Sequence, residues 1–271
     1  YNRVTYEIKL SPFNLRECED FYKSNGVILS RYDIAQSYMV LGGIPYYMGY
    51  VNPGLSLAQN IDNMFFKKNA VFKDEYNRLF ASVFVNPEAV KSIVQLLYTR
   101  NAGFTRKEII EKLGIKDGGR LSSNLNALIS SDFIIKYVPF GHGKREEHYK
   151  LTDPFCMFYL HFIWNRKKLS EKFWQQNVTS SFVSIWRGFA FENVCFNHIE
   201  QIKRSLGISG VITDASAWSK KDDDADGTQI DLLISRNDNV INMCEIKYYN
   251  GEFKVNKDYY LKLLNRQAIL A

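Results

Sequence analysis

Two apolar segments near the C-terminus, residues 229–235 and 240–249, lie on either side of the polar turn sequence RNDN and carry three charged residues. Short alternating apolar runs around a polar turn predict an antiparallel pair of strands. Successive side chains of a strand point to opposite faces, so Glu245 and Lys247 share one face, and antiparallel pairing brings Asp231 near Glu245. Burying such charges without a common partner costs free energy, so we expect all three to form one site.

Two converging carboxylates supply the hard oxygen ligands that Mg²⁺ prefers. We expect Asp231 and Glu245, with the backbone carbonyl of Ile246, to bind Mg²⁺ or Mn²⁺. The ammonium group of Lys247 beside that metal would position a water molecule or offset charge that develops on a phosphate. A surface strand can also alternate Glu and Lys outward without any chemistry, so a purely structural role is the alternative.

The spacing of these residues, an Asp followed after 13 residues by Glu-x-Lys, resembles the core of the PD-(D/E)XK nucleases. The expected order of a helix, a strand, the Asp231 strand, the Glu245–Lys247 strand and a final helix is similar to the αβββα plan of that superfamily. The resemblance implies a fourth member, Glu192 on the first helix, as an outer metal ligand or a group that orients metal-bound water. It also implies Mg²⁺-dependent hydrolysis of DNA phosphodiesters. One departure is Ile230, which stands where the motif name has Pro.

Residues 86–153 have a different pattern, with three short amphipathic helices followed by two alternating strands around FGHGK. Thr105 and Glu108 form a T-x-x-E capping box at the start of the second helix. Three helices and a hairpin are typical of a winged helix-turn-helix. This unit predicts DNA binding through polar and basic side chains of the third helix and the wing, namely Arg120, Ser123, Asn124, Lys144 and Arg145.

The mild net charge of +6 permits contact with nucleic acid but does not require it. Few cations lie on the expected recognition helix, so a winged helix that contacts protein instead of DNA is the alternative. The remaining regions are predominantly helical. Residues 4–10 predict a strand, residues 56–84 predict helix throughout, and residues 154–180 predict an aromatic helical connector.

The order of these parts resembles the C-terminal portion of a family of bacterial and archaeal AAA+ ATPases. The resemblance implies a multi-domain α and α/β fold, divided into four parts: the end of the AAA+ core and helical lid at 1–85, a winged helix-turn-helix at 86–153, a connector at 154–180, and a restriction-endonuclease-like αβββα domain at 181–271. It also implies ATP binding by a preceding P-loop domain. No G-x-x-x-x-G-K-[ST] motif occurs in this sequence, so we expect no ATP hydrolysis from this chain alone.

Other features argue against further classes of site. The four cysteines are far apart, which predicts reduced thiols in a cytoplasmic protein. No apolar run reaches the ~20 residues of a transmembrane helix, so no membrane partner is expected. The four histidines lack zinc-ligand spacing. The acidic sequence DDDADG begins like a calcium loop, but Leu233 stands where the bidentate acid belongs, so a solvated loop is favoured.

Three functional hypotheses follow. The chain is part of a metal-dependent DNA nuclease, or an inactive nuclease-like module that binds DNA or protein and regulates an ATPase domain, or a regulator of ATPase assembly without nucleic acid. The expected partners are DNA and ATPase domains of the same or neighbouring chains. An oligomer is compatible with both kinds of partner. The sequence begins at Tyr1 and ends at Ala271 inside an apparent helix, and we expect further parts of the protein beyond both.

Overall fold

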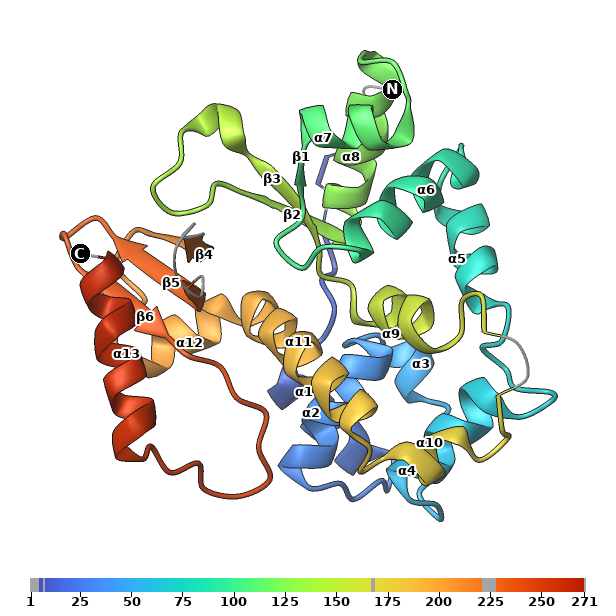
Figure 1. The fold of residues 1–271 in the computed structure, drawn as a ribbon. Helices are drawn as coiled ribbons and strands as arrows, with labels where there is room; N and C mark the ends of the chain where they lie inside the picture. The colour runs from blue at the N-terminus through green and yellow to red at the C-terminus, as the bar shows by residue number, and fades with distance from the viewer. Residues whose placement is uncertain (1–4, 7, 167–168, 221–227, 271) are drawn as a thin grey trace.

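The computed structural model describes residues 5–6, 8–166, 169–220 and 228–270. It is a mixed α/β fold of helices and two three-stranded antiparallel sheets, one in the middle of the chain and one near the C-terminus (Figure 1). None of the helices in these ranges combines the length and hydropathy needed to cross a membrane.

The start of the first N-terminal helix and the end of the second are explained by the residues at those positions. Asn14 caps the first helix and forms a capping box with Glu17. Gly42 ends the second helix with a φ of 64°, a conformation that glycine adopts without steric cost. The elements of this region are α1 (Leu15–Ser24), α2 (Arg31–Leu41), α3 (Pro45–Met48), α4 (Leu57–Ile61), the π-helical turn η1 (Asp62–Phe66) and α5 (Glu75–Val83).

Two predictions for this region are wrong. Residues 5, 6 and 8–10 do not form a strand, and the rest of the expected strand lies outside the described residues. The expected continuous helix over residues 56–84 is interrupted between η1 and α5. There the chain turns to bury Phe72 completely, and the Phe72 N–H donates to the Met64 carbonyl at 2.9 Å. Burial of this aromatic ring outweighs the local preference for helix.

The middle region contains the expected helices and hairpin, and the Thr105–Glu108 capping box is confirmed. A short strand that the pattern did not predict adds a third member, giving the antiparallel sheet order β1-β3-β2. The elements are α6 (Pro87–Tyr98), β1 (Phe104–Thr105), α7 (Arg106–Leu113), α8 (Gly119–Ser130), β2 (Ile134–Tyr137), the 3₁₀ turn η2 (Lys144–Glu146) and β3 (His148–Leu151).

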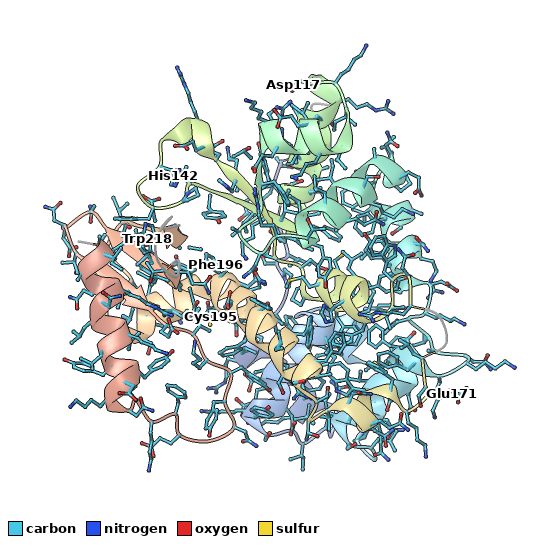
Figure 2. The ribbon with its side chains drawn as sticks, viewed as in Figure 1. Asp117, His142, Glu171, Cys195, Phe196 and Trp218 are labelled. Carbon is cyan, nitrogen blue, oxygen red and sulfur yellow. The ribbon has the colours of Figure 1, made fainter. Side chains whose placement is uncertain are left out.

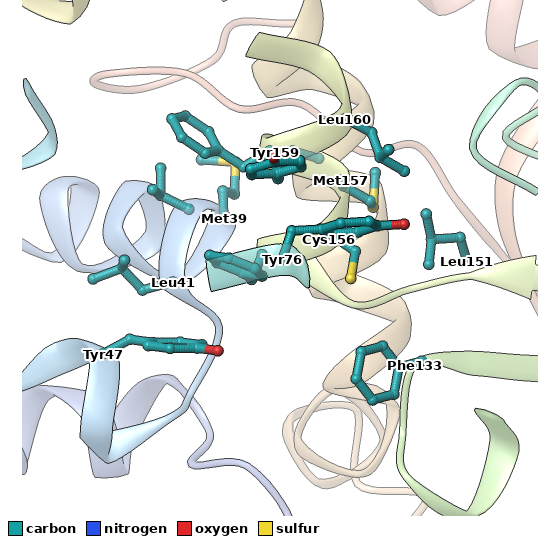
Figure 3. Packing of buried hydrophobic residues seen from close by; sticks show 14 of the residues in the cluster. Met39, Leu41, Tyr47, Tyr76, Phe133, Leu151, Cys156, Met157, Tyr159 and Leu160 are labelled. Carbon is teal, nitrogen blue, oxygen red and sulfur yellow. The ribbon is translucent and has the colours of Figure 1, made fainter. Parts of the chain in front are cut away.

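One hydrophobic core joins the N-terminal helices, the middle region and three further helices: α9 (Pro154–Phe162), α10 (Phe173–Asn177) and α11 (Ser181–Asn197). Nearly every side chain of α9 is buried, so its aromatic residues are core residues, as expected. Figure 3 shows α9 residues packed beside Tyr76, whose ring stacks on Tyr159 at a centroid distance of 4.7 Å. This shared core fixes α11 relative to the middle region.

The C-terminal sheet has the order β4-β5-β6 and lies between α13 on one side and α11 and α12 on the other (Figure 1). Its inner face is a second core of Ile208, Leu232 and Ile234, on which Phe196 and Ile202 pack. Figure 2 shows Cys195 and Phe196 on α11 close to this sheet. The elements are α12 (Ile199–Ser205), β4 (Thr213–Lys220), β5 (Thr228–Arg236), β6 (Ile241–Cys244) and α13 (Lys257–Leu270).

Two expected elements of this region are shorter than predicted. The helix expected over residues 186–206 divides into α11 and α12 at His198, whose backbone leaves the helical region. Its Nδ1 donates to the Val194 carbonyl at 2.7 Å, and its Nε2 accepts from the Leu15 N–H at 2.9 Å. The strand expected over residues 240–249 ends at Cys244. Glu245 and Lys247 therefore follow the strand and do not lie inside it.

Candidate active site

Asp231 is a buried carboxylate in the interior of β5, with only 9% of its surface exposed. The register pairs Leu232 with Cys244, which places Asp231 opposite Glu245 where the ladder ends. Asp231 Oδ2 accepts a hydrogen bond from the Ile246 N–H at 2.9 Å. This side-chain bond takes the place of a further ladder bond and ends β6. Burial raises the pKa of Asp231, and the Glu245 carboxylate adds to the rise.

Glu245 accepts hydrogen bonds on both carboxylate oxygens. Lys247 Nζ donates to its Oε1 at 2.6 Å, and the Tyr259 hydroxyl donates to the same oxygen. Arg266 forms an ion pair with Oε2. Burial alone would raise the pKa of Glu245, but the hydrogen bonds and the neighbouring cations outweigh it and lower the pKa. Tyr259 and Arg266, two turns apart on α13, are site residues that were not predicted from the sequence.

Lys247 connects the two carboxylates. Its Nζ lies 2.6 Å from Glu245 Oε1 and 3.9 Å from Asp231 Oδ2. It also donates to the Ile246 carbonyl at 3.2 Å. Burial alone would lower the pKa of Lys247, but Glu245 and Asp231 outweigh it and raise the pKa, so the ammonium stays charged. The structure therefore brings together the three charged residues of the two C-terminal segments.

Glu192 on α11 lies in the electrostatic neighbourhood of Asp231. Burial raises the pKa of Glu192 to about 7, and the Asp231 charge is the second cause of that rise. The charges of Lys150 and Lys247 act in the opposite direction. The Oε2 atom of Glu192 accepts a hydrogen bond from Asn101 Nδ2 at 2.7 Å. A carboxyl group with this pKa exists in both protonation states near neutral pH.

Asn101 and Lys150 link the middle region to Glu192, and neither residue was predicted from the sequence. Lys150 on β3 is 2% exposed, and its Nζ donates to both Asn101 O and Asn101 Oδ1 at 2.5 Å. Burial lowers the pKa of Lys150 to about 7, against the effect of the Glu192 carboxylate.

Gly103 has a φ of 73°, and an added Cβ would lie 2.0 Å from the Tyr149 carbonyl oxygen. Only glycine lets this turn approach β3 so closely.

The chemistry of the donor set suits a hard divalent cation. Asp231 and Glu245 offer carboxylate oxygens and Ile246 a carbonyl, and Mg²⁺ commonly takes one or two protein carboxylates together with waters and substrate phosphates. In the arrangement described, however, Lys247 and Arg266 already neutralise Glu245. Within the described residues no group of three or more His, Cys, Asp or Glu side chains is placed to hold a metal ion.

The side chains expected to bind DNA lie on two separate parts of the middle region. Arg120 and Ser123 are exposed on α8, and Asn124 is half-buried beside them. Arg120 and Asn124 both line a cavity of about 600 Å³ at the start of this helix. Arg145 is exposed in the loop between β2 and β3, where Figure 2 shows His142, whereas the side chain of Lys144 lies outside the described residues.

The features set aside on sequence grounds have the following positions. His161 Nδ1 and the Tyr98 hydroxyl are 2.5 Å apart, and burial lowers the pKa of His161 to about 4. All four cysteines are free thiols. The acidic sequence DDDADG lies outside the described residues.

Comparison with family models, with curated proteins and with solved structures finds no match for this chain. The functional inference therefore depends on the geometry of the site.

Glu192→Gln is expected to stabilise the folded protein more at about pH 8 than at about pH 5. The folded pKa of about 7 lies above the usual value of 4.5, so the folded state binds more protons than the unfolded state between these values. Stability is then lost as the pH rises through that window. Urea denaturation at the two pH values measures the effect, with the exposed Glu200→Gln as the control. An equal change at both pH values would contradict the expectation.

Proposed function

We propose that this chain carries a PD-(D/E)XK-type nuclease domain that hydrolyses DNA phosphodiesters with Mg²⁺ or Mn²⁺. The observation that carries the proposal is the meeting of Asp231, Glu245 and Lys247 at the end of the β5–β6 ladder, with Lys247 Nζ 2.6 Å from one carboxylate and 3.9 Å from the other. Glu192 supports it, because its charge interacts with that of Asp231 across the helix–sheet interface.

The residues take distinct roles in this proposal. Asp231, Glu245 and the Ile246 carbonyl would hold the metal. A bound Mg²⁺ supplies charge stabilisation to the phosphate and lowers the pKa of a bound water. The Lys247 ammonium donates hydrogen bonds to the phosphate as negative charge develops on it. Glu192, with a pKa of about 7, accepts the proton of the attacking water when it is ionised.

The neighbouring parts support the same proposal. The helices α6, α7 and α8 with the sheet order β1-β3-β2 suit a winged helix. Arg120, Ser123 and Arg145 are exposed and are available to contact DNA. We further propose that the N-terminal helices α1–α5 adjoin an ATP-binding AAA+ domain, which would supply ATP hydrolysis to the assembly.

Lys247→Met is expected to reduce Mn²⁺-dependent cleavage of DNA oligonucleotides by about 100-fold, because one electrostatic donor to the transition state is lost. The matched control is Lys262→Met, an exposed lysine on α13. Cleavage is measured by gel electrophoresis with Mn²⁺ and with EDTA. A wild-type protein that cuts no faster with Mn²⁺ than with EDTA would rule out the nuclease.

A second function, an inactive module that binds DNA or protein, is favoured by one observation. Both oxygens of Glu245 are engaged by cations of the protein itself, Lys247 and Arg266, as in a purely structural ion-pair cluster. This reading predicts salt-dependent DNA binding in gel shifts without cleavage. It also predicts that Arg266→Met destabilises the fold, because Glu245 Oε2 loses its partner while Lys247 and Tyr259 still bond to Oε1.

A further inference from the structure

A cavity of about 350 Å³ lies where the end of α6 meets α9 and α11. Its volume falls in the range of small-molecule sites, and apolar and aromatic side chains with few polar groups are typical of such sites. Two of its apolar residues are largely exposed, Ile185 at 63% and Phe189 at 47%. The main apolar and aromatic lining residues are Leu97, Tyr98, Leu151, Met157, Trp186 and Phe189.

Two observations connect this cavity to the candidate active site. Asn101 lines the cavity and also donates to Glu192 Oε2 at 2.7 Å. Phe189 lines the cavity and precedes Glu192 by three residues on α11. Residues three apart on a helix lie on the same face and about 4.5 Å apart along its axis. The cavity therefore adjoins the carboxylate that we place beside the reacting phosphate.

Two residues that line the cavity each have a buried polar atom without a hydrogen-bond partner among the described residues. Trp186 is 3% exposed, and its indole N–H has no hydrogen-bond partner among the described residues. His161 Nε2 is likewise buried without a partner in the described part of the chain. Unpaired buried polar groups cost free energy.

We propose that this cavity receives an unpaired nucleobase, so that the substrate of the candidate site is DNA with a single-stranded segment next to the scissile phosphate. The inference rests on the proposed nuclease function. Stacking of a base on Phe189 and its aromatic neighbours is favourable and tolerant of sequence, because every base has a π-face. A fully paired base is stacked within the duplex and cannot enter such a cavity without being unpaired.

The test measures binding separately from cleavage. An oligonucleotide containing the fluorescent base 2-aminopurine is titrated with the full chain in EDTA, in single-stranded and fully paired form. We expect tighter binding of the single strand, with quenching of the fluorescence by stacking. Phe189→Ala is expected to weaken binding of the single strand about tenfold. Phe189→Tyr, which keeps the ring, should bind like the wild type.

The matched control is Tyr46→Ala, an exposed aromatic residue on α3 that does not line this cavity. Equal binding of the two DNA forms, or no effect of Phe189→Ala in a protein with an unchanged unfolding transition, would overturn the inference and leave the nuclease function intact. Quenching that depends on Phe189, in a protein that never cleaves with Mn²⁺, would support the base site and remove the nuclease function.

Discussion

Asp231→Asn is expected to weaken Mn²⁺ binding and to reduce Mn²⁺-dependent DNA cleavage by about 100-fold or more. The substitution removes the charge of a carboxylate that is only 9% exposed and lies beside Lys247. An amide keeps the size of the side chain and an oxygen that can accept the Ile246 N–H, so the end of β6 is preserved. Isothermal titration with Mn²⁺ and the oligonucleotide cleavage assay measure the two effects.

The control for this experiment is Asp214→Asn, an exposed residue on β4 of the same sheet. It changes the net charge by the same amount and leaves the candidate site unaltered. If Asp231→Asn bound Mn²⁺ as tightly as this control and cleaved DNA at the same rate, Asp231 would have no role in catalysis. The ion-pair cluster would then be structural.

Asp62→Ala is expected to lower the free energy of unfolding by about 3–5 kcal/mol. Asp62 is 1% exposed and accepts hydrogen bonds from the Trp174 N–H at 2.7 Å, the Gln175 N–H at 3.1 Å and Gln175 Nε2 at 2.8 Å. These bonds tie η1 to the start of α10. The alanine would leave two backbone donors without a partner in the interior, and each such donor costs about 1–3 kcal/mol.

Urea denaturation followed by circular dichroism measures this change. Asp74→Ala is the matched control, because Asp74 is exposed and makes no capping hydrogen bond at the start of α5. A loss of stability no larger than that of Asp74→Ala would mean that the backbone donors near Trp174 find other partners.

The geometry of the three charged residues could be predicted from the sequence because it depends on short-range rules. Antiparallel pairing across the RNDN turn places Asp231 opposite Glu245 at the end of the ladder, although Glu245 follows the last residue of β6. The Thr105–Glu108 capping box could be predicted for the same reason, since both partners lie within one helical turn. The exact end of β6 could not, because it depends on which partner the Ile246 N–H takes.

The remaining residues of the site depend on packing between distant segments. Asn101 reaches Glu192, with Lys150 bonded to Asn101, only because one core holds the middle region against α11. Tyr259 and Arg266 reach Glu245 only after α13 packs on the sheet. A weak signal was present, since these two polar residues are seven positions apart and share a face of α13. The hydrogen bonds of Asp62 could not be predicted from the sequence around it, because its partners lie more than 110 residues further along the chain.

The proposed nuclease function is tested most directly by locating Mn²⁺ through its anomalous scattering in crystals grown with the ion. We predict a peak within ligand distance of both the Asp231 and the Glu245 carboxylates, with Glu245 released from Arg266. A site in which Glu245 keeps its bonds to Lys247 and Arg266 at saturating Mn²⁺, with no peak beside Asp231, would contradict the proposal.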